Sequence, residues 1–325
     1  MKMKMFSNYT NDATFTLDEN VSKVTLTFDA PELEVFSFTK KALFDEPVEN
    51  ITDFKFIVEG QQLYACKKIL ATYSKYMYDW FDNECSQTEM VVTDASCNAF
   101  RVFLGLLYKQ NNLLTASNWH TIVKLACRFR AYLCLEDCEK FNEFSKDLIA
   151  LKYLTIEMQL TGMTKEKNNR RILFTEKQNK LTDIVLSVGD KKFHVSKQIL
   201  AYHSSYFHTM FYSDFGEKKK EEIELKEIDA YEFEMFLHLV YHEHRLYTIE
   251  NIKALLILAQ MYDAQSAIQK CVILLKNEIS GNYVMKIKMS LEFNIPAIID
   301  NVISQLKFQD VQRLRRLLDK KNIGK

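Results

Sequence analysis

The chain repeats itself, and this repeat restricts the possible folds more than any other feature of the sequence. A shift of 130 residues lays 52–81 on 182–211, and ten of those 30 positions carry the same residue. A shift of 133 residues lays 100–138 on 233–271, so the second copy contains three extra residues between 211 and 233. Insertions of this kind belong in surface loops. A repeat of this length predicts two copies of one domain, not a solenoid of short repeats.

Each copy has the residue pattern of a small mixed domain. In copy two, 183–188 alternates apolar and polar residues as a half-buried strand does, and a Gly-Asp pair predicts a hairpin that returns through 193–195. Ser196 is a suitable N-cap for the helix that follows. A third strand is expected at 223–225, with a helix over 231–241 and another after it. The predicted order, β-β-α-α-β-α-α, is that of an α+β domain.

The residues of copy two resemble the BTB (POZ) domain family. The resemblance rests on the run D-I-V-L-S-V-G-D-K-K-F-H-V-S-K-Q-I-L-A-Y-H-S-S-Y-F-H-T-M-F at 183–211, and I-E-L-K-E-I-D-A-Y-E-F-E-M-F-L-H-L-V-Y at 223–241 extends it. Copy one, over 53–138, resembles a degenerate second BTB domain through its match to copy two. The family commonly has His before the Lys of the first helix, where this chain has Ser196 and Cys66. The resemblance implies an α+β chain with two tandem BTB domains.

Five segments are predicted along the chain. They are a β-rich segment over 1–50, a degenerate BTB domain over 51–160, a connection over 161–175, a second BTB domain over 176–278 and a helical extension over 279–325. Alternating residues predict strands at Thr14–Leu17, Val24–Phe28 and Val35–Phe38, which either extend the BTB sheet or form a substrate-binding cap. The extension resembles the box or BACK segment of cullin adaptors; the alternative is that its helices only cover the last BTB helix.

The composition excludes several classes of protein. Lys+Arg and Asp+Glu are both 43, and zero net charge argues against nucleic acid as a partner. The seven glycines are scattered singly, so no phosphate cradle and no cofactor is predicted. No apolar run approaches the roughly 18 residues of a membrane helix, and no secretory signal opens the chain. Seven cysteines without a C-x-x-C pair favour reduced thiols in a cytoplasmic or nuclear protein.

Two pairs of potential metal ligands have the spacing of one helical turn. His238 and His242 are four residues apart, but copy one has no histidine at the matched positions. Cys134 and Cys138 are also four apart, and Cys138 matches Cys271 in the other copy, which favours packing in the core. The sequence shows no third potential ligand for either pair. No metal site and no catalytic constellation is predicted, so the chain is interpreted as a non-enzyme.

An Asp and a Lys recur at matched positions in the two copies. They are Asp53 and Lys67 in copy one, and Asp183 and Lys197 in copy two. The BTB resemblance implies that the matching Asp and basic residue line a partly buried pocket near a dimer interface. A buried charge is costly unless it is paired, so the pair is a candidate for fixing register. The alternative is pairing within each domain without any ligand.

The loop after the second helix of copy two carries the most specific functional motif. It contains Phe215-x-Glu217, whereas 82–87 of copy one has a shorter loop without this pattern. The BTB resemblance implies that the hydrophobic residue inserts into a cullin pocket and that the Glu makes a polar contact. The same resemblance puts Met235 and Tyr241 on the cullin face. Tyr241 also matches Tyr108 in the copy without the motif, which leaves a core role open.

The sequence therefore predicts a protein-interaction adaptor, the substrate-recruiting subunit of a cullin-RING ubiquitin ligase. Its partners would be a cullin scaffold protein and a substrate protein that the sequence does not identify. The alternative is a BTB oligomerisation scaffold without a ubiquitin role, and a metal-dependent enzyme is a third class. Pairing between BTB domains is expected either within one chain or in a homodimer, and internal pairing is favoured.

Overall fold

The structure is a computed structural model, and contacts divide the chain into two compact units. One unit is Ser37–Glu243, and the other combines Met1–Phe36 with His244–Lys325. The structure describes residues 2–5, 13–17, 24–28, 44–84, 86–110, 113–145, 157–158, 174–177, 181–213, 220–242, 247–278 and 283–305.

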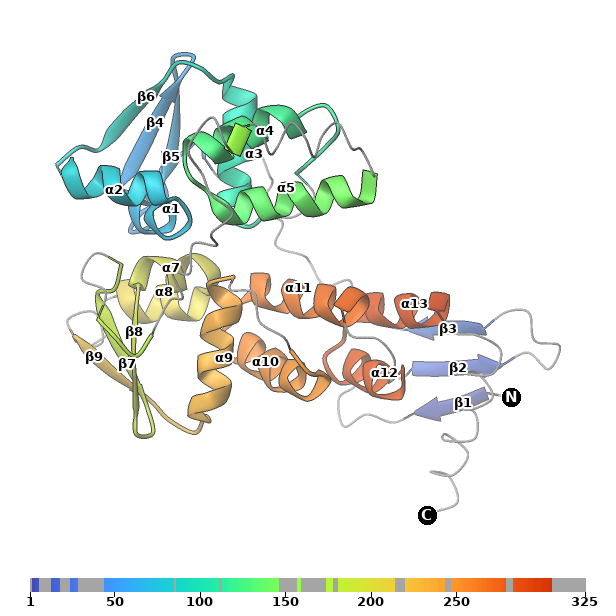
Figure 1. The fold of residues 1–325 in the computed structure, drawn as a ribbon. Helices are drawn as coiled ribbons and strands as arrows, with labels where there is room; N and C mark the ends of the chain where they lie inside the picture. The colour runs from blue at the N-terminus through green and yellow to red at the C-terminus, as the bar shows by residue number, and fades with distance from the viewer. Residues whose placement is uncertain are drawn as a thin grey trace. The chain divides into compact units, whose positions relative to one another are not determined.

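Copy one is a three-stranded sheet with five helices packed beside it (Figure 1). Strands β4 (Phe54–Val58) and β5 (Gln61–Ala65) pair antiparallel, and β6 (Glu89–Val92) pairs parallel with β4. Its helices are α1 (Lys67–Tyr73), α2 (Lys75–Asn83), α3 (Cys97–Leu107), α4 (Trp119–Arg128) and α5 (Tyr132–Ser145). At the hairpin, Glu59 and Gly60 both have positive φ, as a type I′ turn requires.

Copy two repeats this architecture with the same pairing. Strands β7 (Ile184–Val188) and β8 (Lys191–Val195) form the hairpin, and β9 (Glu222–Leu225) pairs parallel with β7. The strand order β8-β7-β9 corresponds to β5-β4-β6 in copy one. Its helices in this unit are α7 (Lys197–His203), α8 (Ser205–Tyr212) and α9 (Ala230–Val240). The predicted hairpin, third strand and α+β fold are confirmed.

The three extra residues of copy two fall in one loop. The second helix of each copy begins at Lys75 and Ser205, which correspond at the shift of 130. The third strand begins at Glu89 and Glu222, which correspond at the shift of 133. The insertion therefore lies between α8 and β9, where it leaves the sheet register of the two copies unchanged.

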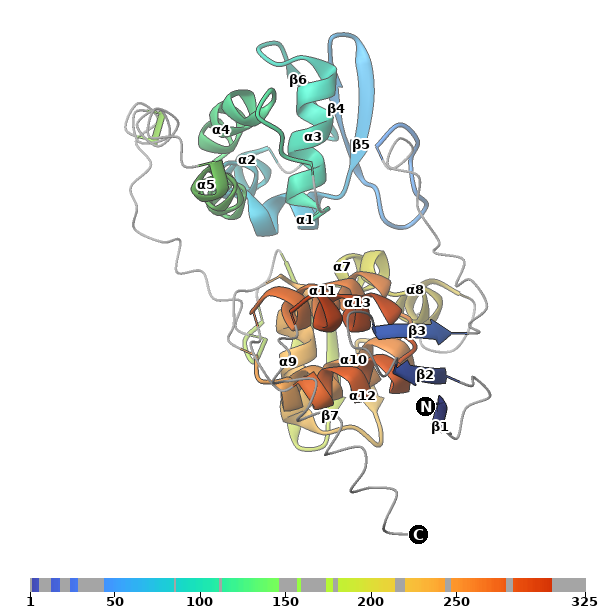
Figure 2. The same cartoon turned by 90° about the vertical axis from the view of Figure 1, so that its right-hand side faces the viewer.

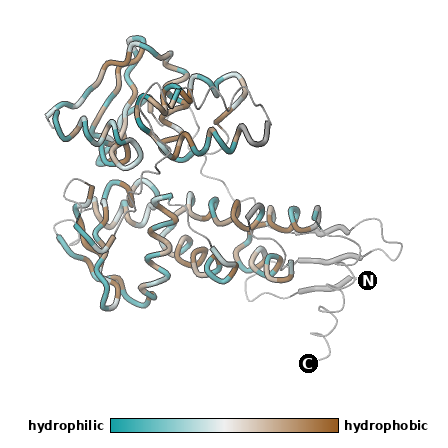
Figure 3. Tube along the Cα trace, in the orientation of Figure 1, coloured by the Kyte–Doolittle hydropathy of each residue, from teal (hydrophilic) through white to brown (hydrophobic). Residues whose placement is uncertain are grey.

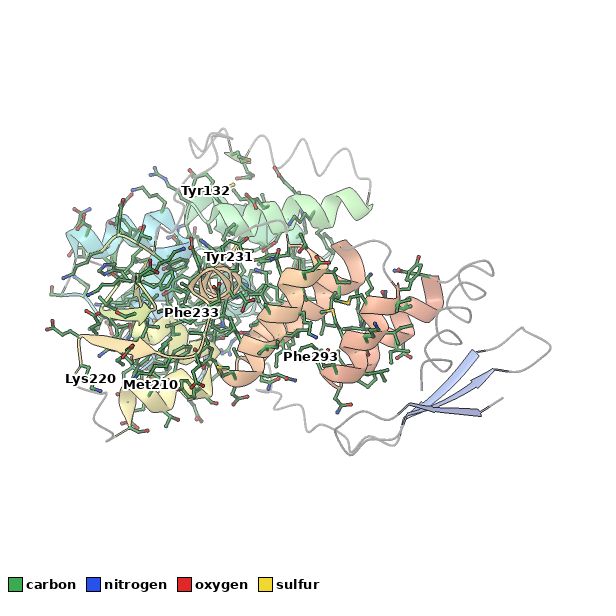
Figure 4. The ribbon with its side chains drawn as sticks, turned by 90° about the horizontal axis from the view of Figure 1, so that it is seen from below. Tyr132, Met210, Lys220, Tyr231, Phe233 and Phe293 are labelled. Atoms are coloured by element: carbon green, nitrogen blue, oxygen red, sulfur yellow. The ribbon has the colours of Figure 1, made fainter. Side chains whose placement is uncertain are left out.

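Aromatic side chains fill the core of each copy. In copy one, Phe56 lies 4.8 Å from Phe100 and Phe100 lies 5.7 Å from Phe129, measured between ring centres, and all three are buried. In copy two, Phe193 lies 5.4 Å from Phe233. Edge-to-face contacts at these distances add stability to the burial of apolar area. Figure 4 labels Phe233, which is buried on α9, and Tyr231, which is 56% exposed two positions earlier on that helix.

Side-chain caps fix where most of these helices begin. Ser74 accepts a bond from the Met77 N–H in copy one, and Ser204 accepts one from the Phe207 N–H in copy two. The predicted cap Ser196 accepts from the Ile199 N–H at 3.3 Å. Such caps satisfy N–H groups that a helix leaves unpaired at its start.

The second unit contains the last two helices of copy two, α10 (Ile249–Met261) and α11 (Gln265–Ile273), and the helices that follow them. The latter are the π-helical turn η2 (Leu274–Glu278), α12 (Tyr283–Glu292) and α13 (Pro296–Gln305), and all of these helices lie together in Figures 1 and 2. Their traces alternate between hydrophilic and hydrophobic residues (Figure 3), as amphipathic helices do. Pro296 begins α13, where its fixed φ and missing N–H suit the first helical turn. No helix in the described ranges is long and apolar enough to cross a membrane.

The N-terminal strands form a sheet of their own. Strand β2 (Ala13–Leu17) pairs antiparallel with β1 (Lys2–Met5) and with β3 (Val24–Phe28). Two of the predicted strands are thus confirmed, and β1 is a strand that the sequence reasoning missed. The predicted strand at 35–38 lies outside the described residues. Of the two roles considered for this segment, the observed pairing gives no support to an extension of the copy-one or copy-two sheet.

Candidate protein-interaction site

Asp53 and Asp183, called the cap aspartates below, hold the first turn of the first helix in each copy. Each lies next to the first strand of its copy. The Oδ1 atom of Asp53 accepts from the backbone N–H of Lys67 at 2.7 Å. The Oδ1 atom of Asp183 accepts from the backbone N–H of Lys197 at 2.8 Å. The first N–H groups of a helix lack partners within it and carry partial positive charge, so a carboxylate is well suited to this position.

Within each copy, the aspartate and lysine predicted to line a pocket are joined by a hydrogen bond to the lysine backbone and not by the expected charge pair. A charge pair would join each carboxylate to the lysine ammonium, whereas each cap aspartate accepts from the lysine backbone. The ammonium of Lys67 lies 5.9 Å from the ring centre of Phe54 and 5.5 Å from that of Phe81. A cation over an aromatic face is stabilised by the ring quadrupole. The role of these residues in a pocket or dimer interface stays a prediction.

The second oxygen of each cap aspartate reaches the other copy. Asp183 Oδ2 forms an ion pair with Lys68 Nζ on α1. Asp53 Oδ2 accepts from Gln198 Nε2 on α7 at 3.2 Å. The same amide nitrogen lies 3.3 Å from the carbonyl oxygen of Ile51. Each first helix thus donates to the carboxylate that caps the first helix of the other copy.

Tyrosines extend the contact between the two copies. The Tyr73 hydroxyl donates to the carbonyl oxygen of Tyr241 at 3.2 Å. The rings of Tyr108 and Tyr202 lie 5.1 Å apart, with their planes 80° from parallel. This edge-to-face geometry is the preferred arrangement of two aromatic rings. The contact between the copies therefore combines an ion pair, amide hydrogen bonds and aromatic packing.

Tyr108 and Tyr241 also brace the start of the first helix within their own copies. The Tyr108 hydroxyl accepts from the Cys66 N–H at 2.6 Å, and the Tyr241 hydroxyl accepts from the Ser196 N–H at 2.9 Å. Burial raises the pKa of both hydroxyl groups well above the usual value of tyrosine. Each hydroxyl is thus a neutral, structural hydrogen-bonding group at neutral pH.

Two of the residues predicted on the cullin face are buried in this structure. Met235 is 6% exposed and Tyr241 is 4% exposed. A side chain buried to this degree cannot form a large contact with a partner unless its cover moves, so the structure favours the core role left open for Tyr241. The cullin-face role of Met235 and Tyr241 stays a prediction.

Phe215 and Glu217 lie outside the described residues. Their segment joins α8 to β9, the connection that contains the three-residue insertion. The corresponding connection of copy one joins α2 to β6. The cullin-binding role of the two residues stays a prediction.

The pairs considered as metal ligands pack against protein groups. His238 is 2% exposed; its ring lies 4.9 Å from Phe174, and its Nε2 lies 3.8 Å from a Glu234 oxygen. Burial raises the pKa of the Cys134 thiol to about 12, and raises that of Cys138 as well. A thiol must lose its proton to bind a metal, and burial opposes that loss. Among the described residues, no group of three His, Cys, Asp or Glu is placed to hold a metal ion.

The sequence reasoning missed two parts of the site. Phe44 and Phe174 each accept at the backbone oxygen from the second strand of their copy, and their rings contact Tyr108 and Tyr241. Their identity at the shift of 130 is a signal that extends the repeat before residue 52. The partnership of Lys68 with Asp183 had no such signal, because Lys68 matches Gln198 rather than another lysine.

Comparison with known proteins identifies the repeated domain. The model of the BTB/POZ domain family matches residues 43–146 and 174–279. BTB and MATH domain-containing protein 15 from Caenorhabditis elegans is 34% identical over 137 residues, which cover 42% of this chain and 50% of that protein. BTB and MATH domain-containing protein 45 from the same organism is 26% identical over 256 residues, covering 70% of this chain and 54% of that protein.

Further similarity is found to vertebrate proteins. Kelch-like protein 40a from Danio rerio is 36% identical over 101 residues, which cover 31% of this chain and 16% of that protein. The solved BTB domain of zebrafish PATZ1 covers 29% of this chain and 75% of its own chain at 26% identity, with a TM-score of 0.25. The chain spans about half the length of the nematode relatives it matches. Because the two family matches together cover more than half of the sequence, the chain belongs to the BTB/POZ domain family and carries two copies of the domain.

Proposed function

We propose that the chain is a non-enzymatic adaptor that recruits a substrate protein to a cullin-RING ubiquitin ligase. The observation that carries this proposal is the single insertion that distinguishes two otherwise matching copies. Strand register and helix starts correspond between the copies, yet the connection between α8 and β9 has three more residues and contains Phe215-x-Glu217. The resemblance to BTB adaptors implies a cullin contact for a hydrophobic-x-Glu pattern at this place.

The substrate contact belongs to another part of the chain under this proposal. The Caenorhabditis relatives are named for a MATH domain beside their BTB domain, and the fish relative is a Kelch-like protein. In this chain we assign the substrate contact to the N-terminal sheet β1–β3 or to copy one. Copy one lacks the Phe-x-Glu pattern, which supports a division of roles between the two copies.

Calorimetric titration of the purified chain with a cullin N-terminal fragment tests the proposal. Phe215→Ala removes an apolar anchor, and we expect it to cost about 2 kcal/mol or more, a loss of affinity of about thirty-fold. Glu217→Ala should cost about 1–3 kcal/mol if its partner is left desolvated. Neither change should lower the melting temperature appreciably, since surface substitutions usually stay within about 0.5 kcal/mol.

Glu84→Ala in copy one is the matched control. Glu84 is exposed just after α2, in the connection that corresponds to the one carrying the motif. This change should leave cullin affinity unchanged. Absence of binding by the wild-type chain would contradict the adaptor proposal. Binding that survives the double change at Phe215 and Glu217 would move the contact elsewhere, with the helices α12 and α13 as the next surface to test.

A scaffold without a ubiquitin role is the second candidate function. The specific observation in its favour is the set of contacts between the two copies at Asp53 and Asp183, which needs no external partner. A chain that binds no cullin yet keeps these contacts would support the scaffold.

A further inference from the structure

We infer that the two BTB domains of one chain bind each other through an exchange of contacts at the cap aspartates, so that the first-helix surface of each domain is occupied within the same molecule. The contacts that carry this inference all lie inside the unit Ser37–Glu243. The inference does not depend on cullin binding. If it holds, the first-helix surface of each domain is covered by the other domain and is not available to a second chain.

The two oxygens of each cap aspartate make different contacts. Oδ1 of each cap aspartate accepts from the first backbone N–H of its own first helix, at 2.7 Å for Asp53 and 2.8 Å for Asp183. Oδ2 of each accepts from a side chain of the other copy, Gln198 for Asp53 and Lys68 for Asp183. Hydrogen bonds to a charged acceptor are stronger than those between neutral groups. Pairing of the domains is thereby joined to the capping of both first helices.

The contacts are reciprocal under the repeat. Lys68 corresponds to Gln198, and Asp53 corresponds to Asp183, at the same shift of 130 residues. Residue 68 of copy one contacts residue 183 of copy two, and residue 198 of copy two contacts residue 53 of copy one. This pattern, in which i contacts j and j contacts i, defines an isologous two-fold interface. Two unrelated surfaces that met by chance would not use corresponding residues on both sides.

The flanking residues make the interface asymmetric in detail. Tyr202 packs against Tyr108, whereas its counterpart in copy one is Thr72, which has no ring to offer. One side of the exchange is an ion pair from a lysine, and the other is a hydrogen bond from a glutamine. Two copies of the second domain alone would place Gln198 opposite Asp183 on both sides, without the ion pair. Pairing of copy one with copy two is therefore the combination that includes both the ion pair and the Tyr108–Tyr202 packing.

Covalent connection favours the pair within one chain. Two modules joined in one chain meet at a high effective concentration, because the closure entropy of the connecting segment grows only slowly with its length. Free chains at micromolar concentration compete poorly with this. If the proposed adaptor function also holds, each molecule presents one Phe215-x-Glu217 loop, since copy one lacks the pattern.

Zero-length carbodiimide cross-linking of the full chain at micromolar concentration tests the inference. The reagent activates a carboxylate, the lysine amine displaces the activated group to form an amide, and the reagent leaves as its urea. We expect a peptide in which Lys68 is joined to Asp183, recovered from the band of the 38.3 kDa monomer. Lys55 and Glu89, which lie 2.9 Å apart within copy one, provide the internal positive control.

Two variants make the result specific to the exchange. Lys68→Arg keeps the positive charge but removes the reactive amine, so the joined peptide should disappear. Gln198→Lys should add a second joined peptide between position 198 and Asp53, because the exchange is reciprocal. Recovery of the Lys68–Asp183 peptide only from a dimer band would overturn pairing within the chain. Its absence while the Lys55–Glu89 product forms would overturn the interface itself. The cross-linking experiment contains no cullin, so a negative result in it is distinct from a failure of the proposed adaptor function.

Discussion

Lys286 on α12 is a lysine held inside the protein. It is 0% exposed, and its Nζ has no hydrogen-bond partner in the part of the chain that the structure describes. Burial lowers its pKa, because the charged ammonium loses its hydration. The folded state therefore binds this proton less tightly than the unfolded chain, whose lysine pKa is about 10.4. Stability from this group rises with pH between the folded and the unfolded pKa.

Lys286→Met should stabilise the protein, because it replaces a buried amine with an apolar side chain of similar length. We expect a gain of about 1–3 kcal/mol in the free energy of unfolding at neutral pH, the usual cost of an unsatisfied buried polar group. The gain should shrink as pH approaches about 10, since the wild-type lysine then loses its proton in both states. Urea unfolding at several pH values measures both effects.

Lys253→Met is the matched control for this prediction. Lys253 is 39% exposed and pairs with Glu292 at 2.9 Å, so removing it should change stability by less than about 1 kcal/mol. A gain for Lys286→Met that does not vary with pH would show that the amine is not buried in its charged form.

At the scale of elements, a tyrosine after one helix fixes the start of another. Tyr108 ends α3 and Tyr241 ends α9. Their hydroxyls accept from the N–H of Cys66 and Ser196, the N-caps of α1 and α7. Buried backbone N–H groups are almost always paired, so these bonds join elements that are far apart in sequence. The brace occurs in both copies, which favours a structural role over a role in partner binding.

Tyr241→Phe tests this interpretation. The change leaves the Ser196 N–H without its acceptor and should lower the free energy of unfolding by about 1–3 kcal/mol, with cullin affinity unchanged. Tyr108→Phe should destabilise copy one to a similar degree. Chemical unfolding and calorimetric titration of the same samples provide the comparison. Loss of cullin affinity without loss of stability would restore Tyr241 to a partner surface.

At the scale of the whole molecule, pairing inside the chain predicts a monomer. Light scattering at micromolar concentration should give a mass of 38.3 kDa. Changing both Lys68→Glu and Gln198→Glu places negative charges opposite Asp183 and Asp53. Like charges at this distance repel, so the hydrodynamic radius should increase while the mass stays the same. A dimer mass in the wild type that falls to a monomer mass in the double variant would instead indicate pairing between chains.

The sequence by itself determined the features that depend on local pattern. The repeat, the Gly189-Asp190 hairpin turn, the Ser196 cap and the Pro296 helix start follow from residue type and periodicity, which act over a few positions. The shift between the copies also restricted the insertion to 211–233, and the structure narrowed it to the connection between α8 and β9.

Only the tertiary structure decided which groups meet across the chain. The sequence marked Asp183 and Lys197 as matched residues, but the carboxylate binds the backbone of Lys197 and the ammonium of Lys68. It left Tyr241 open between a partner face and the core, whereas the structure buries that side chain with its hydroxyl on the Ser196 N–H. These partnerships join residues 14, 45 and 115 positions apart, and they depend on which oxygen of one carboxylate points to which helix. The periodicity of a sequence does not predict such partners, because it shows which face of an element is apolar and not what that face contacts.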